Sequence, residues 1–336
     1  MDRFKPKKIR SYVSAYLREA VPSGIWRIFI PDFLASLAER DDIEYILARV
    51  FYYNRIRENF KLDDDALRLK DLWKVKSSSM YKHDAWRTSR WFDQRLKWKL
   101  DCGDVNWVCR SPSITKSRPI RDDNRNNIIL KLDRCRHFNF ISDPYRYQDK
   151  ADRSVFMADI GDAGKMNRVE FMKMYFGSNI CDCGSIRNLP GGVLPSEWLR
   201  PKMKIREMLQ YKFIIALEGN DVATSLKWIM SSRSLAVMPR PTCETWFMEK
   251  TLIPDYHYVE IKPDYSDLRD KIRYFSSHTD EALAIIENAH GYIRQFQDKE
   301  REDIIEYLVL LKYFRDSGQL PADSFPFGEE YDKFDY

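Results

Sequence analysis

A short polar turn in the second half of the chain has the composition of a phosphate-binding loop. It follows an apolar run at residues 211–217, typical of a buried strand, and precedes a helical pattern at residues 223–230. A helix N-terminus after a strand presents free backbone N–H groups to an anion, and Gly219 lets a ligand approach the backbone closely. Lys227, one turn into the predicted helix, is a candidate phosphate cation. The same arrangement also occurs in cores without a ligand, so spacing alone does not decide between the two interpretations.

A second polar cluster covers residues 116–127, which are all polar except for Pro119 and Ile120. Such a segment can present carboxylates and cations to a polar substrate such as a sugar. It can also be an exposed, turn-rich loop, and composition alone favours this second interpretation.

Glu244 stands at the start of a predicted helix over residues 244–249, which follows an apolar run at 235–238. A carboxylate in this position can accept hydrogen bonds from a ribose diol, as acidic residues do in nucleotide-binding sheets. More often such a residue offsets the helix dipole.

The elements that would position these groups alternate between strand and helix. Predicted strands at 211–217, 235–238 and 256–261 are separated by the helices at 223–230 and 244–249. This alternation predicts a doubly wound α/β fold with a parallel sheet. Three further helices are predicted at the C-terminal end: 266–275, 279–296 and 301–314.

The N-terminal half has weaker periodicity. Residues 43–56 indicate a helix, 128–132 fit either a strand or a helix, and 138–141 indicate a strand. The sequence Leu-Pro-Gly-Gly-Val-Leu-Pro at 189–195 predicts a domain edge near 189–200. The expected organisation is therefore an N-terminal domain at 1–190, a C-terminal domain at 196–315, and an acidic, aromatic tail at 316–336.

Length and composition exclude several classes of protein. A chain of 336 residues with 44% hydrophobic residues can bury a substantial core in two domains, and it is too apolar for a disordered chain. No signal-peptide core and no membrane-spanning stretch are visible, and the six cysteines do not suggest a disulfide framework. Cys181 and Cys183 form a close pair without evident further ligands at zinc-like spacing, so no bound metal is expected.

The positive charge is concentrated at the start of the chain. Residues 1–30 contain seven Lys or Arg and two acidic residues, a balance of +5 that equals the net charge of the whole chain. This segment could lie on an anionic membrane surface, or it could be a solvated terminus. Nucleic-acid binding would need a broader basic face and is not expected.

The polar turn and its neighbours resemble glycosyltransferase family 90. The resemblance rests on residues 211–228, Met238-Pro239, 244–249, 256–259 and 264–268. Shorter matches in the N-terminal half are 115–120, 127–132, 136–138 and 149–150. The resemblance covers roughly residues 100–315. Within the family, the sequence resembles the bacterial lipopolysaccharide-core branch most.

The resemblance implies a GT-B-like α/β fold, in which two Rossmann-like domains face each other across a cleft, here with a helical C-terminus. It also implies an inverting, metal-independent transfer from a UDP-sugar held mainly by the C-terminal domain. No cofactor is expected beyond this donor substrate.

The resemblance also carries site residues onto this chain. The donor-binding residues would be Glu218, Gly219, Asn220, Asp221, Val222, Ala223, Thr224, Ser225, Lys227 and Glu244. Further possible substrate contacts are Lys116, Arg118, Arg136, His137, Asp159 and Gly161. Asp123 is the first candidate for the catalytic base, followed by Asp122 and Asp104. Many relatives have an aromatic-Arg-Gly segment that touches the donor, whereas this chain has no arginine from Phe156 until Arg168.

The predicted function is transfer of a hexose from a UDP-sugar to the oligosaccharide core of lipopolysaccharide or lipooligosaccharide. The enzyme would be cytoplasmic and peripheral on the inner membrane, where the basic N-terminus would meet anionic lipid near a lipid-linked acceptor. Two alternatives remain open: a protein O-glycosyltransferase of the same family, and a nucleotide- or carbohydrate-binding module without catalytic activity.

Overall fold

The chain folds into two units, each built from segments that are distant in the sequence. The computed structural model describes residues 24–25, 28, 30–37, 39–77, 79–161, 165–187, 194–325 and 327. Unit 1 comprises residues 1–135, 244–246 and 296–336, and unit 2 comprises 136–243 and 247–295. Both sides of the edge predicted near residues 189–200 belong to unit 2, so the division into these two units falls elsewhere. The basic segment 1–23 lies outside the described residues.

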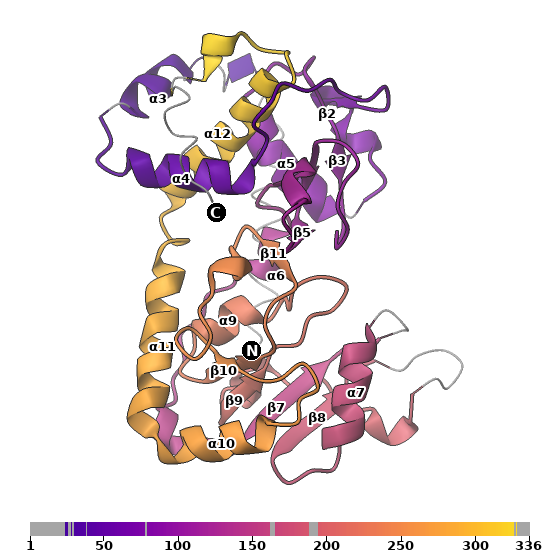
Figure 1. Ribbon diagram of the computed structural model, residues 1–336, viewed down its shortest axis with the longest axis vertical. Helices are drawn as coiled ribbons and strands as arrows, with labels where there is room; N and C mark the ends of the chain where they lie inside the picture. Colours follow the sequence, from indigo (N-terminus) through magenta and orange to yellow (C-terminus); the bar gives the residue numbers. More distant parts are fainter. Residues whose placement is uncertain are drawn as a thin grey trace. The chain divides into compact units, whose positions relative to one another are not determined.

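Unit 2 is built on a five-stranded parallel sheet (Figure 1). Its strands are β7 (Ala151–Ala158), β8 (Cys181–Ser185), β9 (Tyr211–Ile215), β10 (Leu235–Met238) and β12 (Val259–Glu260). Their spatial order is β12-β10-β9-β7-β8. Numbered along the chain, this is the 2-1-3-4-5 order of doubly wound folds, whose topological switch point lies between the first and third strands. In unit 2 that point lies between β7 and β9.

Helices cover the sheet of unit 2. They are α7 (Met166–Tyr175), α8 (Ile205–Met208), α9 (Leu226–Met230), α10 (Leu268–Ser277) and α11 (Thr279–Arg294), with α6 (Arg134–His137) at the boundary with unit 1. Phe156 and Phe213 on one face of the sheet belong to an apolar cluster with Phe171 of α7 and Ile272 of α10. The alternate residue Ile214 is also buried. Both faces are thus covered, as parallel sheets require.

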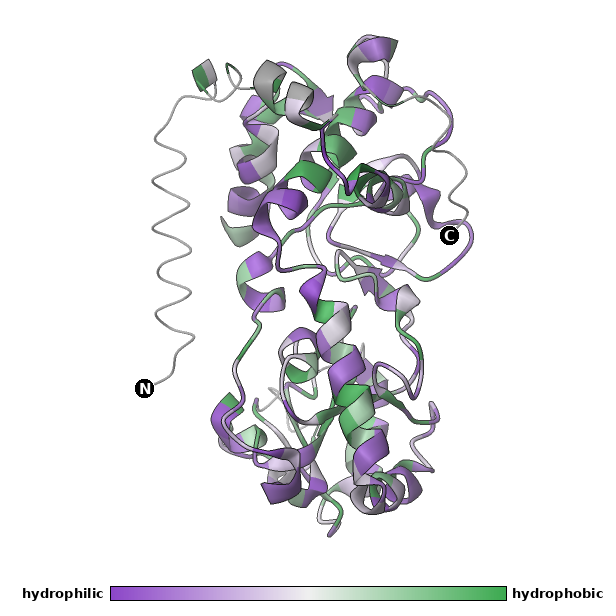
Figure 2. Ribbon diagram, turned by 90° about the vertical axis from the view of Figure 1, so that its left-hand side faces the viewer, coloured by the Kyte–Doolittle hydropathy of each residue, from purple (hydrophilic) through white to green (hydrophobic). Residues whose placement is uncertain are grey.

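Unit 1 combines helices with a smaller parallel sheet. The helices are α3 (Ile30–Leu37), α4 (Ile43–Tyr53), α5 (Ser79–Ser89) and α12 (Lys299–Asp316). The parallel strands are β3 (Leu100–Asp101), β4 (Ser113–Thr115) and β6 (Asn127–Ile129), with β4 in the centre. Two pairs complete the unit: β1 (Leu67–Arg68) with β2 (Lys97–Trp98), and β5 (Ser117–Pro119) with β11 (Cys243–Thr245). Hydrophilic and hydrophobic residues both occur along the helices (Figure 2), and α10 buries Leu268, Ile272 and Phe275 as an amphipathic helix does.

Short 3-10 turns connect these elements. They are η1 (Leu69–Lys74), η2 (Asn124–Asn126), η3 (Tyr147–Asp149), η5 (Ser196–Trp198), η6 (Glu249–Thr251) and η7 (Ala322–Ser324). Within the described part of the chain, none of the helices has both the length and the apolar character needed to cross a bilayer.

Several predicted elements are confirmed. Helix α4 lies within the predicted 43–56, the strand at 235–238 is β10, and the two longest C-terminal helices are α11 and α12. The predicted strands at 211–217 and 256–261 appear as β9 and the shorter β12. The alternative left open at 128–132 is resolved by β6, which is a strand.

Two predicted elements are wrong. Residues 138–141 contain no strand, and residues 244–249 do not form a helix. The second segment begins instead with β11, which pairs with β5, and continues to the 3-10 turn η6. Pairing with a strand more than a hundred residues away decides this segment, and local periodicity cannot reveal such a partner.

Candidate active site

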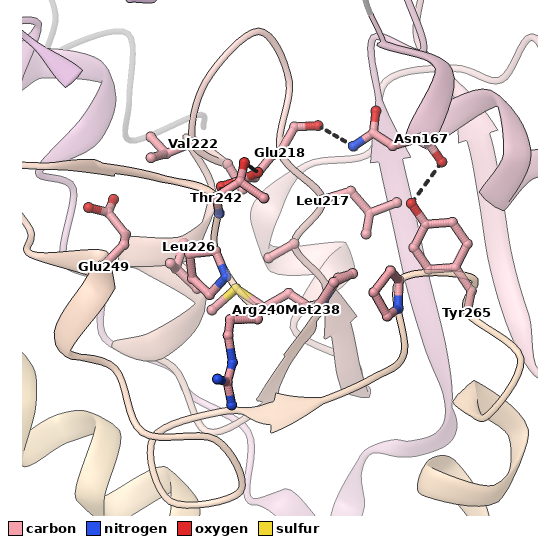
Figure 3. Close-up of a pocket in the computed structure, with 15 residues that line it drawn as sticks. Asn167, Leu217, Glu218, Val222, Leu226, Met238, Arg240, Thr242, Glu249 and Tyr265 are labelled. Carbon is pink, nitrogen blue, oxygen red and sulfur yellow. Dashed lines mark hydrogen bonds between the residues drawn. The ribbon is translucent and has the colours of Figure 1, made fainter. Parts of the chain in front are cut away.

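A pocket lies at the C-terminal edge of the sheet in unit 2 (Figure 3). Its walls come from the ends of β9 and β10, the loop before α9, the segment after β12, and the first turn of α7. The lining residues are Asn167, Ala216, Leu217, Glu218, Val222, Ala223, Leu226, Met238, Pro239, Arg240, Pro241, Thr242, Glu249, Pro263 and Tyr265. The pocket encloses about 200 Å³. This is below the roughly 300–1,000 Å³ of most ligand sites.

Glu218 places a carboxylate at the wall of this pocket. Its Oε1 accepts hydrogen bonds from the backbone N–H groups of Thr242 at 3.0 Å and Cys243 at 3.2 Å, and its Oε2 accepts one from the Thr242 hydroxyl. Burial raises the pKa of Glu218, and the three hydrogen bonds offset this only in part. The pocket therefore contains an acid that takes up a proton above the usual pH for glutamate.

Arg168 of α7 joins the two strands at the switch point. Its guanidinium donates hydrogen bonds to the backbone carbonyl oxygens of Asp159 at 2.8 Å, Leu217 at 2.9 Å and Glu218 at 2.9 Å. Asp159 follows β7, and the other two residues follow β9. Burial lowers the pKa of Arg168, and the charge of the Asp159 carboxylate offsets this only in part; within the described residues, no carboxylate lies at ion-pair distance from the guanidinium. A positive charge without a paired anion thus lies where doubly wound sheets bind their ligands.

Gly219 lies directly against this guanidinium. A Cβ atom on Gly219 would be 3.1 Å from Nη2 of Arg168, a tight contact. In the same loop, the Gly219 N–H donates to the carbonyl of Asp221 at 2.9 Å, and Val222 and Ala223 face the pocket. The helix that follows begins at Leu226 and has five residues, whereas the sequence predicts it from residue 223. The loop therefore contacts the pocket, with Asn220 exposed and Thr224 and Ser225 half-buried.

Lys227 is not presented to the pocket as a mobile cation. It is fully buried, with its Nζ 2.5 Å from Oε1 of Glu249, which is 1% exposed. Glu249 lines the pocket and Lys227 does not. Lys227 therefore compensates a buried carboxylate, which corrects its predicted role as a phosphate cation.

Glu244 belongs to unit 1 and is not among the residues that line the pocket. Its Oε1 accepts from Nε of Arg118 at 2.7 Å, and its Oε2 accepts from the hydroxyl of Tyr52. Arg118 and Glu244 are both 0% exposed. A ribose contact needs a reachable carboxylate, so this arrangement corrects the predicted role of Glu244 and makes Arg118 its structural partner.

A second set of polar residues occupies the C-terminal edge of the parallel sheet in unit 1. Asp104 follows β3, Lys116 follows β4, and Asp133 follows β6. Nζ of Lys116 lies 2.5 Å from Oδ1 of Asp104 and 6.0 Å from the ring centre of Tyr81. Burial raises the pKa of Tyr81. The positive charge of Lys116 lowers this pKa, and the negative charges of Asp133 and Asp104 raise it further. Asp133 has a left-handed backbone with φ of 54°, a strain that is common at functional sites.

Asp122 and Asp123 lie elsewhere in unit 1, in an exposed turn after β5. The carboxylate of Asp123 binds Arg121 at 3.0 Å, and these side chains are 58% and 64% exposed. In the structure, the third-ranked candidate base, Asp104, is the one at a sheet edge with other polar groups.

The remaining predicted contacts lie in unit 2. Asp159 and Gly161 follow β7, where the Asp159 carboxylate is 3.5 Å from both Lys165 and Arg187. At the end of α6, Arg136 is exposed and His137 is buried. Of these residues, Asp159 alone shares the switch point with Arg168, through its backbone carbonyl.

The structure was also searched for metal-ligand geometry. In the described ranges, no three His, Cys, Asp or Glu side chains gather as ligands would. Cys181 and Cys183 are buried in the apolar cluster of unit 2.

Sequence reasoning missed Arg168, Asp133 and the Thr242 contacts to Glu218. The available signal for Arg168 is its place as the first arginine after Phe156, in a region where many relatives have an aromatic-Arg-Gly segment. Its helix lies fifty residues before the loop that it contacts, so spacing along the chain could not reveal the contact. Asp133 follows the apolar run at 128–132, and an acid after a parallel strand is a usable signal.

The fold and the pocket together define an α/β protein with a ligand-binding edge on a doubly wound sheet. Residues 196–315 match the model of a family described as glycosyl transferase family 90. The chain is 37% identical over 266 residues to the O-glucosyltransferase LpsA of Dichelobacter nodosus, in an alignment that covers 79% of this chain and 81% of that protein. It is also 34% identical over 121 residues to the uncharacterized protein 035R of Invertebrate iridescent virus 3, which covers 35% of this chain and 10% of that one. The chain belongs to glycosyl transferase family 90 and is a glycosyltransferase.

Proposed function

We propose that this chain transfers glucose from a UDP-sugar, with inversion, to a hydroxyl group on the oligosaccharide core of a lipopolysaccharide or lipooligosaccharide. Membership of the family supports the transferase reaction. The name of the Dichelobacter nodosus relative, an O-glucosyltransferase, supports glucose as the transferred sugar.

One observation carries the proposed donor site: the guanidinium of Arg168 at the switch point beside the pocket. Its three hydrogen bonds go to carbonyl oxygens, which fix its position but do not neutralise its charge. A guanidinium has five N–H donors, so two remain for a ligand. A diphosphate supplies the missing anion, and Arg is well suited to bind phosphate oxygens. In this proposal Arg168 supplies the cation that many relatives have in their aromatic-Arg-Gly segment and that this chain lacks between Phe156 and Arg168.

The proposed reaction follows from these groups. A carboxylate takes the proton from the acceptor hydroxyl while the oxygen attacks the anomeric carbon of glucose. The bond from that carbon to the diphosphate oxygen breaks, and UDP leaves with the electron pair. Arg168 stabilises the negative charge that develops on the leaving diphosphate, so the proposal does not call for a metal ion.

We place the base at the sheet edge in unit 1, at Asp104. Asp104 is half-exposed, as a base must be to reach an acceptor, whereas Asp133 at the same edge is only 1% exposed.

Transfer from UDP-glucose, measured with wild-type protein and two Asn variants, tests this assignment. Asp104→Asn should lower kcat by about 10²–10⁴ while leaving the affinity for UDP nearly unchanged. Asp123→Asn is the matched control in the exposed turn and should retain activity. If Asp123→Asn alone abolishes transfer, the base lies in that turn. If wild-type protein neither binds UDP nor turns over any UDP-sugar, the proposed function is wrong.

The basic N-terminal segment supplies the proposed membrane contact of this cytoplasmic enzyme. Deleting residues 1–10 removes Arg3, Lys5, Lys7, Lys8 and Arg10 together with Asp2, a loss of four positive charges. Binding to anionic vesicles should weaken strongly, because each basic residue near such a surface contributes about 1 kcal/mol. Activity on a soluble acceptor should remain. Unchanged vesicle binding would exclude this role.

A further inference from the structure

Unit 1 contains a second pocket, lined by both cationic and aromatic side chains. It lies between α3, the end of α5 and the first turns of α12. The lining residues are Phe33, Arg87, Thr88, Arg90, Trp91, Lys299, Asp303 and Tyr307. The pocket encloses about 160 Å³. A cavity of about 150 Å³ holds a molecule the size of benzene, so there is room for one six-membered ring.

The charge of this pocket is positive. Arg87, Arg90 and Lys299 contribute three cations, against the single carboxylate of Asp303. Nη2 of Arg87 donates to Oδ1 of Asp303 at 2.7 Å, and Nζ of Lys299 donates to Oδ2 at 2.6 Å. Asp303 thus holds two cations in place, and these three side chains keep a surplus of one positive charge. Lys299 is 76% exposed, so its ammonium group can also reach a ligand at the mouth.

Aromatic rings form the apolar wall of the pocket. The rings of Phe33 and Tyr307 meet edge to face, with centroids 5.2 Å apart, and Tyr307 is stacked on Phe92 at 4.8 Å. Trp91 is half-buried, and the guanidinium carbon of Arg90 lies 5.7 Å from its ring centre. The rings are fixed by their neighbours, so the wall is preformed. A few placed polar groups on such a wall are typical of small-ligand sites.

We propose that this pocket binds one sugar unit that carries a phosphate or carboxylate group. The C–H face of a sugar ring packs on aromatic rings, and guanidinium groups bind phosphate and carboxylate oxygens in matching geometry. A neutral sugar would not compensate the surplus positive charge, and inorganic phosphate would make no packing contact with the aromatic wall. This identification rests on the proposed function: the bound unit is an anionic sugar of the acceptor. Unit 1 would hold this sugar and unit 2 would hold the donor.

The test uses the full chain with UDP present at saturation, so that the donor site is occupied. Glucose 6-phosphate, glucuronate, glucose and inorganic phosphate are titrated separately by calorimetry. We expect glucose 6-phosphate and glucuronate to bind at least about tenfold more tightly than either glucose or phosphate, since each lacks one half of the recognition. Equal affinities for glucose 6-phosphate and inorganic phosphate would overturn the proposal, and so would equal affinities for glucose 6-phosphate and glucose.

Two variants locate the binding. Lys299→Gln should weaken glucose 6-phosphate binding about three- to tenfold, because an exposed charge contributes modestly. Trp91→Ala should weaken glucose 6-phosphate binding but spare that of inorganic phosphate. Lys74→Gln is the matched control, since Lys74 is also 76% exposed and pairs with Asp71 outside the pocket. Unchanged binding in both pocket variants would overturn the assignment. Because affinity for UDP is measured separately, failure of the proposed function would show independently.

Discussion

Arg168 and Lys227 show that the surroundings of a basic residue decide what it can do. Both are basic residues close to the loop at 218–225. Lys227 is neutralised by Glu249, whereas Arg168 is bound by three carbonyl oxygens that leave its charge in place. An anionic ligand would therefore gain electrostatic attraction from Arg168 but not from Lys227.

The variant Arg168→Gln should therefore lower the affinity for UDP about 10- to 100-fold, the equivalent of one or two hydrogen bonds to a charged group. Affinity for uridine, which has no phosphate, should not change, and calorimetry can measure both. Arg273→Gln is a control in the same unit, since Arg273 is exposed and pairs with Asp270. Equal losses for UDP and uridine would show that Arg168 acts only on the structure of the loop.

Glu218 should make donor binding depend on pH. Its pKa is raised by burial, so as pH falls it becomes neutral earlier than an ordinary glutamate. Neutralisation removes repulsion from the diphosphate, so the affinity for UDP-glucose should rise as pH falls through that pKa and decline above it. Glu218→Gln should bind about three- to tenfold more tightly at pH 8 and show a flat profile. A wild-type profile parallel to that of the variant would contradict this expectation.

At the scale of elements, the sequence predicts what depends on local pattern. The apolar runs at 211–217 and 235–238 contain strands, and the acid and glycine that follow the first run lie at the pocket edge of the sheet. Residues 243–245 form β11 because β5 offers a partner, and the position of Glu244 follows from that pairing. Arg168 reaches the site from another helix. These long-range contacts could not be predicted from spacing.

Burial of the Arg118–Glu244 pair predicts a large effect on stability. Replacing Glu244 by Gln leaves a buried guanidinium without its counter-charge and should lower the free energy of unfolding by about 3–5 kcal/mol. Asp123→Asn breaks the exposed pair with Arg121 and should cost less than about 1 kcal/mol. Urea unfolding measures both. If Glu244→Gln is as stable as wild-type protein but has a raised KM for the donor, the result would support the predicted role of Glu244 as a ribose contact.

At the scale of the whole molecule, a buried network explains why unit 1 needs three separate segments. Glu302 of α12 accepts hydrogen bonds from Arg49 at 2.5 Å, Lys131 at 2.6 Å and Nε1 of Trp246 at 2.6 Å. Arg49 and Lys131 come from the first segment, Trp246 from the second, and Glu302 from the third. The attraction of Lys131 and Arg49 outweighs the effect of burial, and the pKa of Glu302 is lowered. The carboxylate thus depends on cations that lie far away in the sequence.

This dependence predicts how fragments of the chain will behave. A fragment of residues 196–315 contains the family match, but it leaves β9 without β7 and leaves Glu302 without Arg49 and Lys131. It should not unfold cooperatively, because a buried charge without a partner costs several kcal/mol. A fragment of residues 136–295 retains the five-stranded sheet and Arg168, and it should give a cooperative thermal transition that UDP shifts upward. Circular dichroism with and without UDP compares the two. A cooperative transition in the shorter fragment alone would mean that the domain edge lies near residue 196 after all.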